Sequence, residues 1–202
     1  MALIVRSLIE ALRRGLFARR SAGIAAIEFA LLAPVFVMVF AGTIDVGNAL
    51  YIQTLLDSAV AAGTNYALVN AASVTANTDP STGTALASEL ASRIATIVSS
   101  SNGGTAANTT VAVNNGPSVS IAGGLKISSG TTSNANLCYC PTGSPPSWTW
   151  GSSVTCGNGC TGGGTAGKFV TVTASYSITP FFPAYTFVRS GTMTMGSAAQ
   201  TQ

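Results

Sequence analysis

The side chains of this chain that could do chemistry are few, and they are mainly acids and cysteines. The 202 residues include six acids, four cysteines and no histidine. The commonest general base and metal ligand is therefore missing. Asp79 and Glu89 are isolated acids, and the sequence contains neither a G-x-S-x-G motif nor a phosphate-binding loop. These residues predict a protein without enzymatic activity, cofactor or metal.

The four cysteines are Cys138, Cys140, Cys156 and Cys160. Four thiolates could hold zinc, but zinc sites favour C-x2-4-C pairs and a C-x-C pair is unusual. We expect two disulfides instead, in a compartment where disulfides persist. Three connectivities are possible. A Cys138–Cys140 ring would be strained, and we favour the nested pairs Cys138–Cys160 and Cys140–Cys156.

One acid, Glu28, lies near the start of an apolar run. Residues Ile24 to Ile44 contain no other charge. As a helix they would span about 30 Å, the thickness of a hydrocarbon core, so we predict a single transmembrane helix. A carboxylate within hydrocarbon costs roughly 2.5–3.5 kcal/mol on insertion scales. Some other group should therefore offset the free-energy cost of placing the Glu28 carboxylate in the membrane.

The positive charge of the chain is confined to its N-terminal segment. Residues 1–23 contain five arginines and one glutamate, whereas the remainder has a net charge of −1. A basic flank before an apolar helix is typical of a cytoplasmic N-terminus. Nucleic-acid binding is disfavoured, because no basic patch lies beyond this flank.

The sequence divides into four segments. Residues 1–23 form the basic cytoplasmic leader and 24–44 the transmembrane helix. Residues 45–100 form an extramembrane helical region, in which the first helix continues to about residue 72. A break at 77–84 precedes a second amphipathic helix, for which Thr84 is a candidate N-cap. Residues 101–202 form a Gly/Ser/Thr-rich β domain that carries the four cysteines.

The β domain shows alternation of apolar and polar residues. Val170, Val172 and Ala174 alternate with threonines in "KFVTVTASYSITP". Shorter stretches with the same pattern are "TTVAVNNG" and "PSVSIAGGLKISSG", and "GTMTMGSAAQ" is expected to form the last strand. This period predicts strands with one buried face. The expected fold class is α+β, with a small antiparallel sheet covered on one face by the helices.

The stretch from Gly23 to Phe29 resembles the type IV prepilin cleavage site, in which a glycine precedes a mature segment with glutamate at its fifth position. The resemblance implies that a prepilin peptidase cuts after Gly23 and makes Ile24 the new N-terminus. The new amine would then lie one helical turn from Glu28. In an assembled filament, the carboxylate of Glu28 could pair with the amine of a neighbouring subunit.

A longer stretch, about residues 20–70, is similar to the TadE-like family of tight-adherence (Flp) pilus systems. Asn48 stands where arginine is common in that family. The positions that carry the resemblance are Gly23, Ala25, Ala26, Ile27, Glu28, Phe29, Ala30, Leu31, Pro34, Asp45, Gly47, Tyr66 and Ala67.

The resemblance implies a pilin-like protein of pilus biogenesis, acting as a minor pilin or pseudopilin. Its partners would be the inner membrane, other pilins or pseudopilins, the pilus assembly machinery and a prepilin peptidase, with no nucleic acid. The protein would cross the bacterial inner membrane once, with its N-terminus in the cytoplasm and its C-terminal domain in the periplasm. It could also be associated with the pilus.

Other interpretations remain open at this point. The chain could be a membrane-tethered envelope protein or an adhesin-like binding module that never enters a filament. An exported enzyme is a weaker alternative. Glu28 could be a tolerated charge near the interface, or the run Leu31–Phe40 could belong to a secretory signal peptide cleaved after Ala41. Asp45 is expected at the outer interface of the span, where its role could simply be to end the membrane segment.

Overall fold

The structure is a computed structural model that describes residues 2–75, 80–101, 107–144, 146–183, 188 and 190–201. In the N-terminal helix, side chains are described for residues 24–70. The chain forms two compact units. One consists of Met1–Gly47 and Pro180–Val188, and the other of Asn48–Thr179 and Arg189–Gln202.

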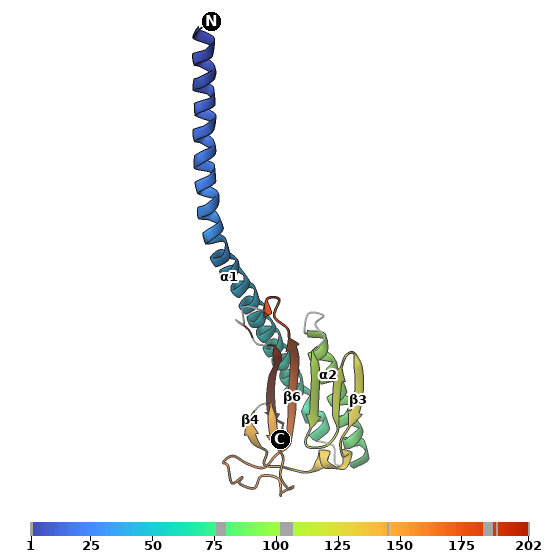
Figure 1. Ribbon diagram of the computed structural model, residues 1–202. Coiled ribbons are helices and arrows are strands. Elements are labelled where there is room, and N and C mark those ends of the chain that lie inside the picture. Colours follow the sequence, from blue (N-terminus) through green and yellow to red (C-terminus); the bar gives the residue numbers. More distant parts are fainter. Residues whose placement is uncertain are drawn as a thin grey trace. The chain divides into compact units, whose positions relative to one another are not determined.

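Two helices make up the N-terminal half. Helix α1, Ala2–Thr75, is continuous through Pro34 and is labelled in Figure 1. Helix α2 is Pro80–Ser101. The prediction that Thr84 caps the second helix is wrong, because the helix already begins at Pro80. Proline is favoured at the first helical position, where its missing N–H needs no partner and its fixed φ suits the helix.

The C-terminal half is antiparallel. Strands β1 (Asn108–Val113), β2 (Ser118–Ala122), β3 (Leu125–Ser129), β6 (Phe169–Ile178) and β7 (Gly191–Gln200) form one sheet in the order β3-β2-β1-β6-β7. Strands β4 (Thr142–Ser144) and β5 (Ser147–Thr149) form a separate hairpin. The predicted α+β class is confirmed. The hairpin and the 3-10 helix η1 (Thr132–Asn136) were not expected.

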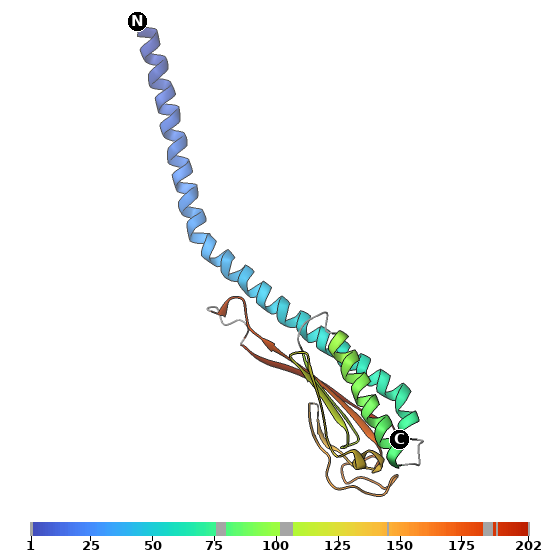
Figure 2. The same cartoon turned by 90° about the vertical axis from the view of Figure 1, so that its right-hand side faces the viewer.

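The alternation in the sequence sets the buried face of the sheet. Val119, Val111 and Val172 are opposite one another on β2, β1 and β6, and each is at most 2% exposed. Figure 2 shows that α2 and the part of α1 in the second unit lie on the same side of the sheet. The sequence predicts that Val170, Val172, Ala174, Tyr176 and Ile178 share one face of β6. Four of these residues are buried as expected, and Tyr176 is half-buried. Burial of such aliphatic side chains is the main stabilising contribution.

Tight turns join the first three strands. Asn114 and Asn115, which follow β1, both have a φ of 54°. Gly123 and Gly124, between β2 and β3, also have positive φ. Positive φ at both central residues is the geometry of a type I′ turn, whose twist matches the flanking strands. Asparagine and glycine tolerate this conformation best.

Asn114 also connects three parts of this unit. It is 1% exposed, and its amide Nδ2 donates to the carbonyls of Asn134, Ala135 and Leu137 around η1. Its Oδ1 accepts a hydrogen bond from the N–H of Phe169 at the start of β6. A buried amide needs such partners, and here they hold the β1–β2 turn, η1 and β6 together.

Small residues allow the two helices to approach each other closely within the second unit. Ala59, Gly63 and Ala67 are all buried and follow one another at every fourth position of α1. A Cβ atom on Gly63 would lie 2.5 Å from Cγ2 of Val98 in α2 and 3.4 Å from Cγ1 of Val172 in β6. Gly63 therefore marks the point where α1, α2 and the sheet meet.

Two disulfides close the segment between η1 and β6. They join Cys138 to Cys156 and Cys140 to Cys160, with Cα–Cα distances of 5.1 and 5.7 Å. The prediction of two disulfides is confirmed, but the favoured nested pairing, Cys138–Cys160 and Cys140–Cys156, is wrong.

The backbone explains the interleaved pairing. Tyr139 pairs antiparallel with Gly167, and Gly159 pairs antiparallel with Thr165. Cys138 also pairs antiparallel with Val154, two residues before Cys156, which brings these two cysteines together. Because Tyr139 and Gly159 both pair with the short segment 165–167, their neighbours Cys140 and Cys160 also lie close together. The ring of Tyr139 also packs edge-on against Trp150, with centroids 5.9 Å apart.

Candidate functional site

The apolar segment predicted to cross a membrane lies on α1. Among the described residues, one helix is long and apolar enough to span a bilayer, and the qualifying stretch is Ile24–Asn70. Its large apolar side chains between 24 and 40 are exposed. Phe29 is 70% exposed and Leu31 is 73% exposed. An exposed apolar surface of this length is typical of a membrane or protein interaction site.

The four residues of the predicted cleavage motif also lie on α1. Gly23 and Ile24 are within the continuous helix, and Ile24, Glu28 and Phe29 are exposed. Glu28 makes no hydrogen bond or ion pair with any residue of the described ranges. The structure therefore places the motif on an accessible helix, and no described group of the same chain compensates for Glu28.

Asp45 has a different environment from Glu28. It is 2% exposed, and its two carboxylate oxygens accept hydrogen bonds from the backbone N–H groups of Phe181 (2.8 Å) and Phe182 (3.2 Å). These residues belong to the same compact unit as the N-terminal part of α1. Hydrogen bonds to a charged acceptor are stronger than neutral ones. Sequence analysis assigned Asp45 only the end of the membrane segment and missed this contact, whose partners are far away in the chain.

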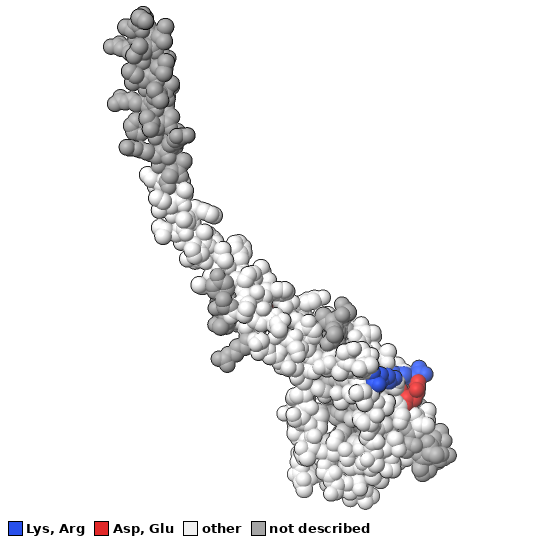
Figure 3. Space-filling model, turned by 45° about the vertical axis from the view of Figure 1, so that its right-hand side comes forward, with Lys and Arg blue, Asp and Glu red and all other residues white. Residues whose placement is uncertain are grey.

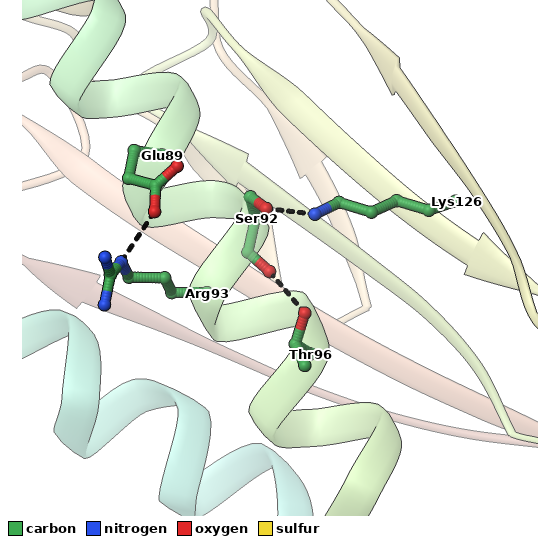
Figure 4. Close-up of polar contacts among 5 residues, drawn as sticks. All are labelled: Glu89, Ser92, Arg93, Thr96 and Lys126. Carbon is green, nitrogen blue, oxygen red and sulfur yellow. Dashed lines mark hydrogen bonds and ion pairs between the residues drawn. The ribbon is translucent and has the colours of Figure 1, made fainter.

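Charged side chains gather at one place on the face shown in Figure 3. Figure 4 shows that Nε of Arg93 donates to Oε1 of Glu89 (2.7 Å) one turn away on α2, while Lys126 of β3 donates to the hydroxyl of Ser92. The hydrogen bond to Glu89 raises the pKa of Arg93. This ion pair is exposed, and exposed pairs add little to stability. The cluster is therefore a solvated helix face rather than a catalytic group.

Lys168 is the one buried cation in the described ranges. It precedes β6 and is 8% exposed, and burial lowers the pKa of its ammonium group. Its carbonyl accepts a hydrogen bond from the N–H of Thr201, which joins the start of β6 to the end of β7. Its position in the fold therefore indicates a structural role.

A shallow depression lies beside the disulfide Cys140–Cys160. Its walls include the glycine-rich turn 162–164 and the side chains of Phe169 and Gln200. Within the described ranges it is lined by no acid or base, and no cluster of metal-ligating residues is found. The depression therefore offers no arrangement for acid–base or metal chemistry.

Comparison with known proteins bears on the apolar helix. Residues 23–65 match the family model described as TadE-like protein. This segment is similar to the TadE-like family. The match begins at Gly23 and includes Glu28, Pro34, Asp45 and Gly47. No curated protein and no solved structure matches the chain significantly. The TadE-like segment thus covers the exposed apolar helix and its continuation into the second unit, and not the β-sheet.

Proposed function

We propose that this TadE-like protein is a non-enzymatic component of a tight-adherence (Flp) pilus system, acting as a minor pilin or pseudopilin. The observation that carries the proposal is the match over residues 23–65, which coincides with an exposed apolar helix at the N-terminus. The helix anchors the protein in the bacterial inner membrane and packs with other subunits. The sheet and its two disulfides then lie in the periplasm, where disulfides persist.

Within this proposal, the peptide bond between Gly23 and Ile24 is cut by a prepilin peptidase. Cleavage removes the arginine-rich leader and creates an α-amine one helical turn before Glu28. The amine of one subunit pairs with the Glu28 carboxylate of its neighbour, and each charge offsets the cost of burying the other. The exposed position of Glu28 and its lack of a partner within the described ranges support a partner from another chain.

The second candidate function is a membrane-tethered envelope or adhesin-like module that stays outside a filament. The disulfide-linked loop 138–168 favours it, because a cross-linked exposed loop suits binding outside the cytoplasm. This candidate requires no cleavage at Gly23 and no amine partner for Glu28.

The variant Glu28→Ala separates the two candidates in piliated cells of the host bacterium. We expect normal cleavage, because the scissile bond and its glycine are retained. Assembly should fall by at least about tenfold, since the unpaired amine costs roughly 2.5–3.5 kcal/mol in hydrocarbon. Pili are counted by electron microscopy. Asp57→Ala, which removes an exposed acid from α1 in the second unit, is the matched control and should assemble normally.

Normal piliation of the Glu28→Ala cells would show that assembly does not require the pairing of the amine with the Glu28 carboxylate. Loss of piliation in the Asp57→Ala cells as well would show that assembly responds to any lost acid on α1, rather than to Glu28 in particular.

A further inference from the structure

The connection between β6 and β7 is attached to α1 through Asp45. The carboxylate of Asp45 holds the N–H groups of Phe181 and Phe182, although the residues are 136 and 137 positions apart in the chain. This connection, Pro180–Val188, also belongs to the compact unit that contains the apolar helix and not to the unit that contains the sheet. The start of the loop is therefore fixed to the helix.

The contact lies at the end of the apolar run. Residues 29–44 contain no charge, and Asp45 is the first acid after Glu28. Because Ile24–Ile44 is as long as a hydrocarbon core is thick, Asp45 falls at the membrane–water interface on the far side from the N-terminus. Phe181 and Phe182 are held at the same level, because their amide nitrogens lie within 3.2 Å of the Asp45 oxygens.

The loop start is suited to a low-dielectric environment. In the sequence Pro180-Phe181-Phe182-Pro183, the two prolines have no N–H group, and both phenylalanine N–H groups donate to Asp45. All four residues therefore lack a free backbone donor. An unsatisfied donor in lipid costs several kcal/mol. The absence of free N–H groups at residues 180–183 therefore removes a main barrier to the insertion of this segment.

The side chains of Phe181 and Phe182 are aromatic, and one of the two is exposed to solvent. Phe181 is 67% exposed, and residues 179–183 carry no charge. Phenylalanine is among the residues that interfacial segments bury at the boundary between headgroups and acyl chains. We propose that Phe181 and Phe182 form a second membrane contact of this protein, inserting between the lipid headgroups and the acyl chains while Asp45 holds their backbone. The proposal rests on the membrane anchor described under the proposed function.

Quenching of tryptophan fluorescence by brominated lipids tests the proposal. The full chain is reconstituted in vesicles of phosphatidylcholine brominated near the top of the acyl chains. Tryptophan is introduced by Phe181→Trp in a background with Trp148→Phe and Trp150→Phe. The matched control is Leu125→Trp, which replaces another exposed apolar residue on β3 in the second unit. We expect roughly threefold stronger quenching of the probe at position 181 than of the probe at position 125.

Two further variants make the outcomes distinct. Phe36→Trp reports on the apolar helix itself and is measured in vesicles whose lipid is brominated near the ends of the acyl chains, because Phe36 lies in the middle of the predicted span. Adding Asp45→Ala to the position-181 probe should reduce its quenching toward that of the position-125 control, whereas adding Asp57→Ala should leave it unchanged. If the Asp45→Ala change leaves the quenching intact, the proposed role of Asp45 is overturned.

Quenching at position 36 without quenching at position 181 would overturn this inference and leave the membrane anchor intact. Absence of quenching at both positions would overturn the anchor as well. A position-181 probe that is protected from both brominated lipid and aqueous acrylamide would show that protein, and not lipid, covers the loop, which also contradicts the lipid contact.

Discussion

The carboxylates of Glu28 and Asp45 lie at opposite ends of the apolar run of α1 and differ in what surrounds them. Glu28 is exposed and has no partner within the described ranges, whereas Asp45 is 2% exposed and binds two backbone N–H groups. Sequence analysis could identify Glu28 as costly, because the apolar run around it is local. It could not find the partners of Asp45, because Phe181 and Phe182 come next to the helix only through the fold.

Asn114 illustrates the same limit at the level of a single residue. The sequence "VNNG" predicts a turn, and a turn is present. The hydrogen bonds from its side chain to the carbonyls around η1 depend on the path of residues 130–137, which have no periodic pattern. Local propensity therefore predicted its backbone and not its contacts.

Thr109 is the residue at which we predict a gain in stability. Its hydroxyl is buried in β1 without a hydrogen-bond partner in the described structure, and the residue is 1% exposed. Thr109→Val removes the unsatisfied hydroxyl and keeps the shape of the side chain. The free energy of unfolding should rise by about 1–2 kcal/mol, measured by denaturant titration of the chain in detergent.

The neighbouring residue provides the control for this prediction. Thr110 is on the opposite, exposed face of β1. Thr110→Val should change the free energy of unfolding by no more than about 0.5 kcal/mol. A Thr109→Val protein that is less stable than the parent would mean that the hydroxyl has a partner and that this account of β1 is wrong.

At the scale of elements, the sequence predicted the helices and strands well because their patterns are local. The alternation of β6 identified most of its buried face, and the two shorter alternating stretches cover β2, β3 and all of β1 except its first residue. From the sequence alone, Gly63 counts only as a residue of low helix propensity within α1. The structure shows why a glycine is suited to this position: α2 and β6 approach too closely for a side chain.

Gly63→Ala tests that contact. The new Cβ would lie 2.5 Å from Val98, a buried side chain with a stiff χ1, so Val98 or the helix must shift. Overpacking costs about 1–3 kcal/mol, and alanine regains up to about 1 kcal/mol of helix propensity. We expect a net loss of about 1–2 kcal/mol in the free energy of unfolding.

Gly47→Ala is the same change at an open position of the same helix, since no atom lies within 4 Å of the added Cβ. It should leave stability unchanged or slightly increased. Equal effects of the two substitutions would show that helix propensity, and not the close approach at Gly63, determines the result.

The disulfide pairing is a further feature of the elements that sequence could not decide. It depends on isolated bridges such as Cys138–Val154 and Tyr139–Gly167, which join positions far apart in the sequence. Each bridge closes a loop of moderate length, with sequence separations of 18 and 20, and would contribute about 3 kcal/mol by restricting the unfolded chain.

Peptide mapping of the unreduced, denatured protein checks the pairing. Chymotrypsin cuts after Tyr139 and separates Cys138 from Cys140, and hydroxylamine cuts between Asn158 and Gly159 and separates Cys156 from Cys160. We expect mass spectrometry to find linked peptides containing Cys138 with Cys156 and Cys140 with Cys160. Linked peptides containing Cys138 with Cys160 would instead support the nested arrangement.

At the scale of the whole molecule, the TadE-like match and the fold bear on different parts of the chain. The match covers residues 23–65, whereas the sheet and the disulfides lie beyond residue 107. The N-terminal segment was identifiable from sequence because a membrane span, a basic flank and a glycine–glutamate spacing are all linear features. The partners of the sheet could not be predicted in the same way. The surface of the sheet is formed by strands that are far apart in the sequence, and a linear pattern does not describe such a surface.

The central claim is that this protein acts after cleavage, as a pilin-type subunit with Ile24 at its N-terminus. Intact-mass analysis and N-terminal sequencing of the protein extracted from membranes of the host bacterium test it most directly. We predict a mature chain that begins Ile24-Ala25-Ala26 and lacks the 23-residue leader. A membrane-bound chain that still begins at its original N-terminus would contradict this account and leave a simple membrane-tethered protein.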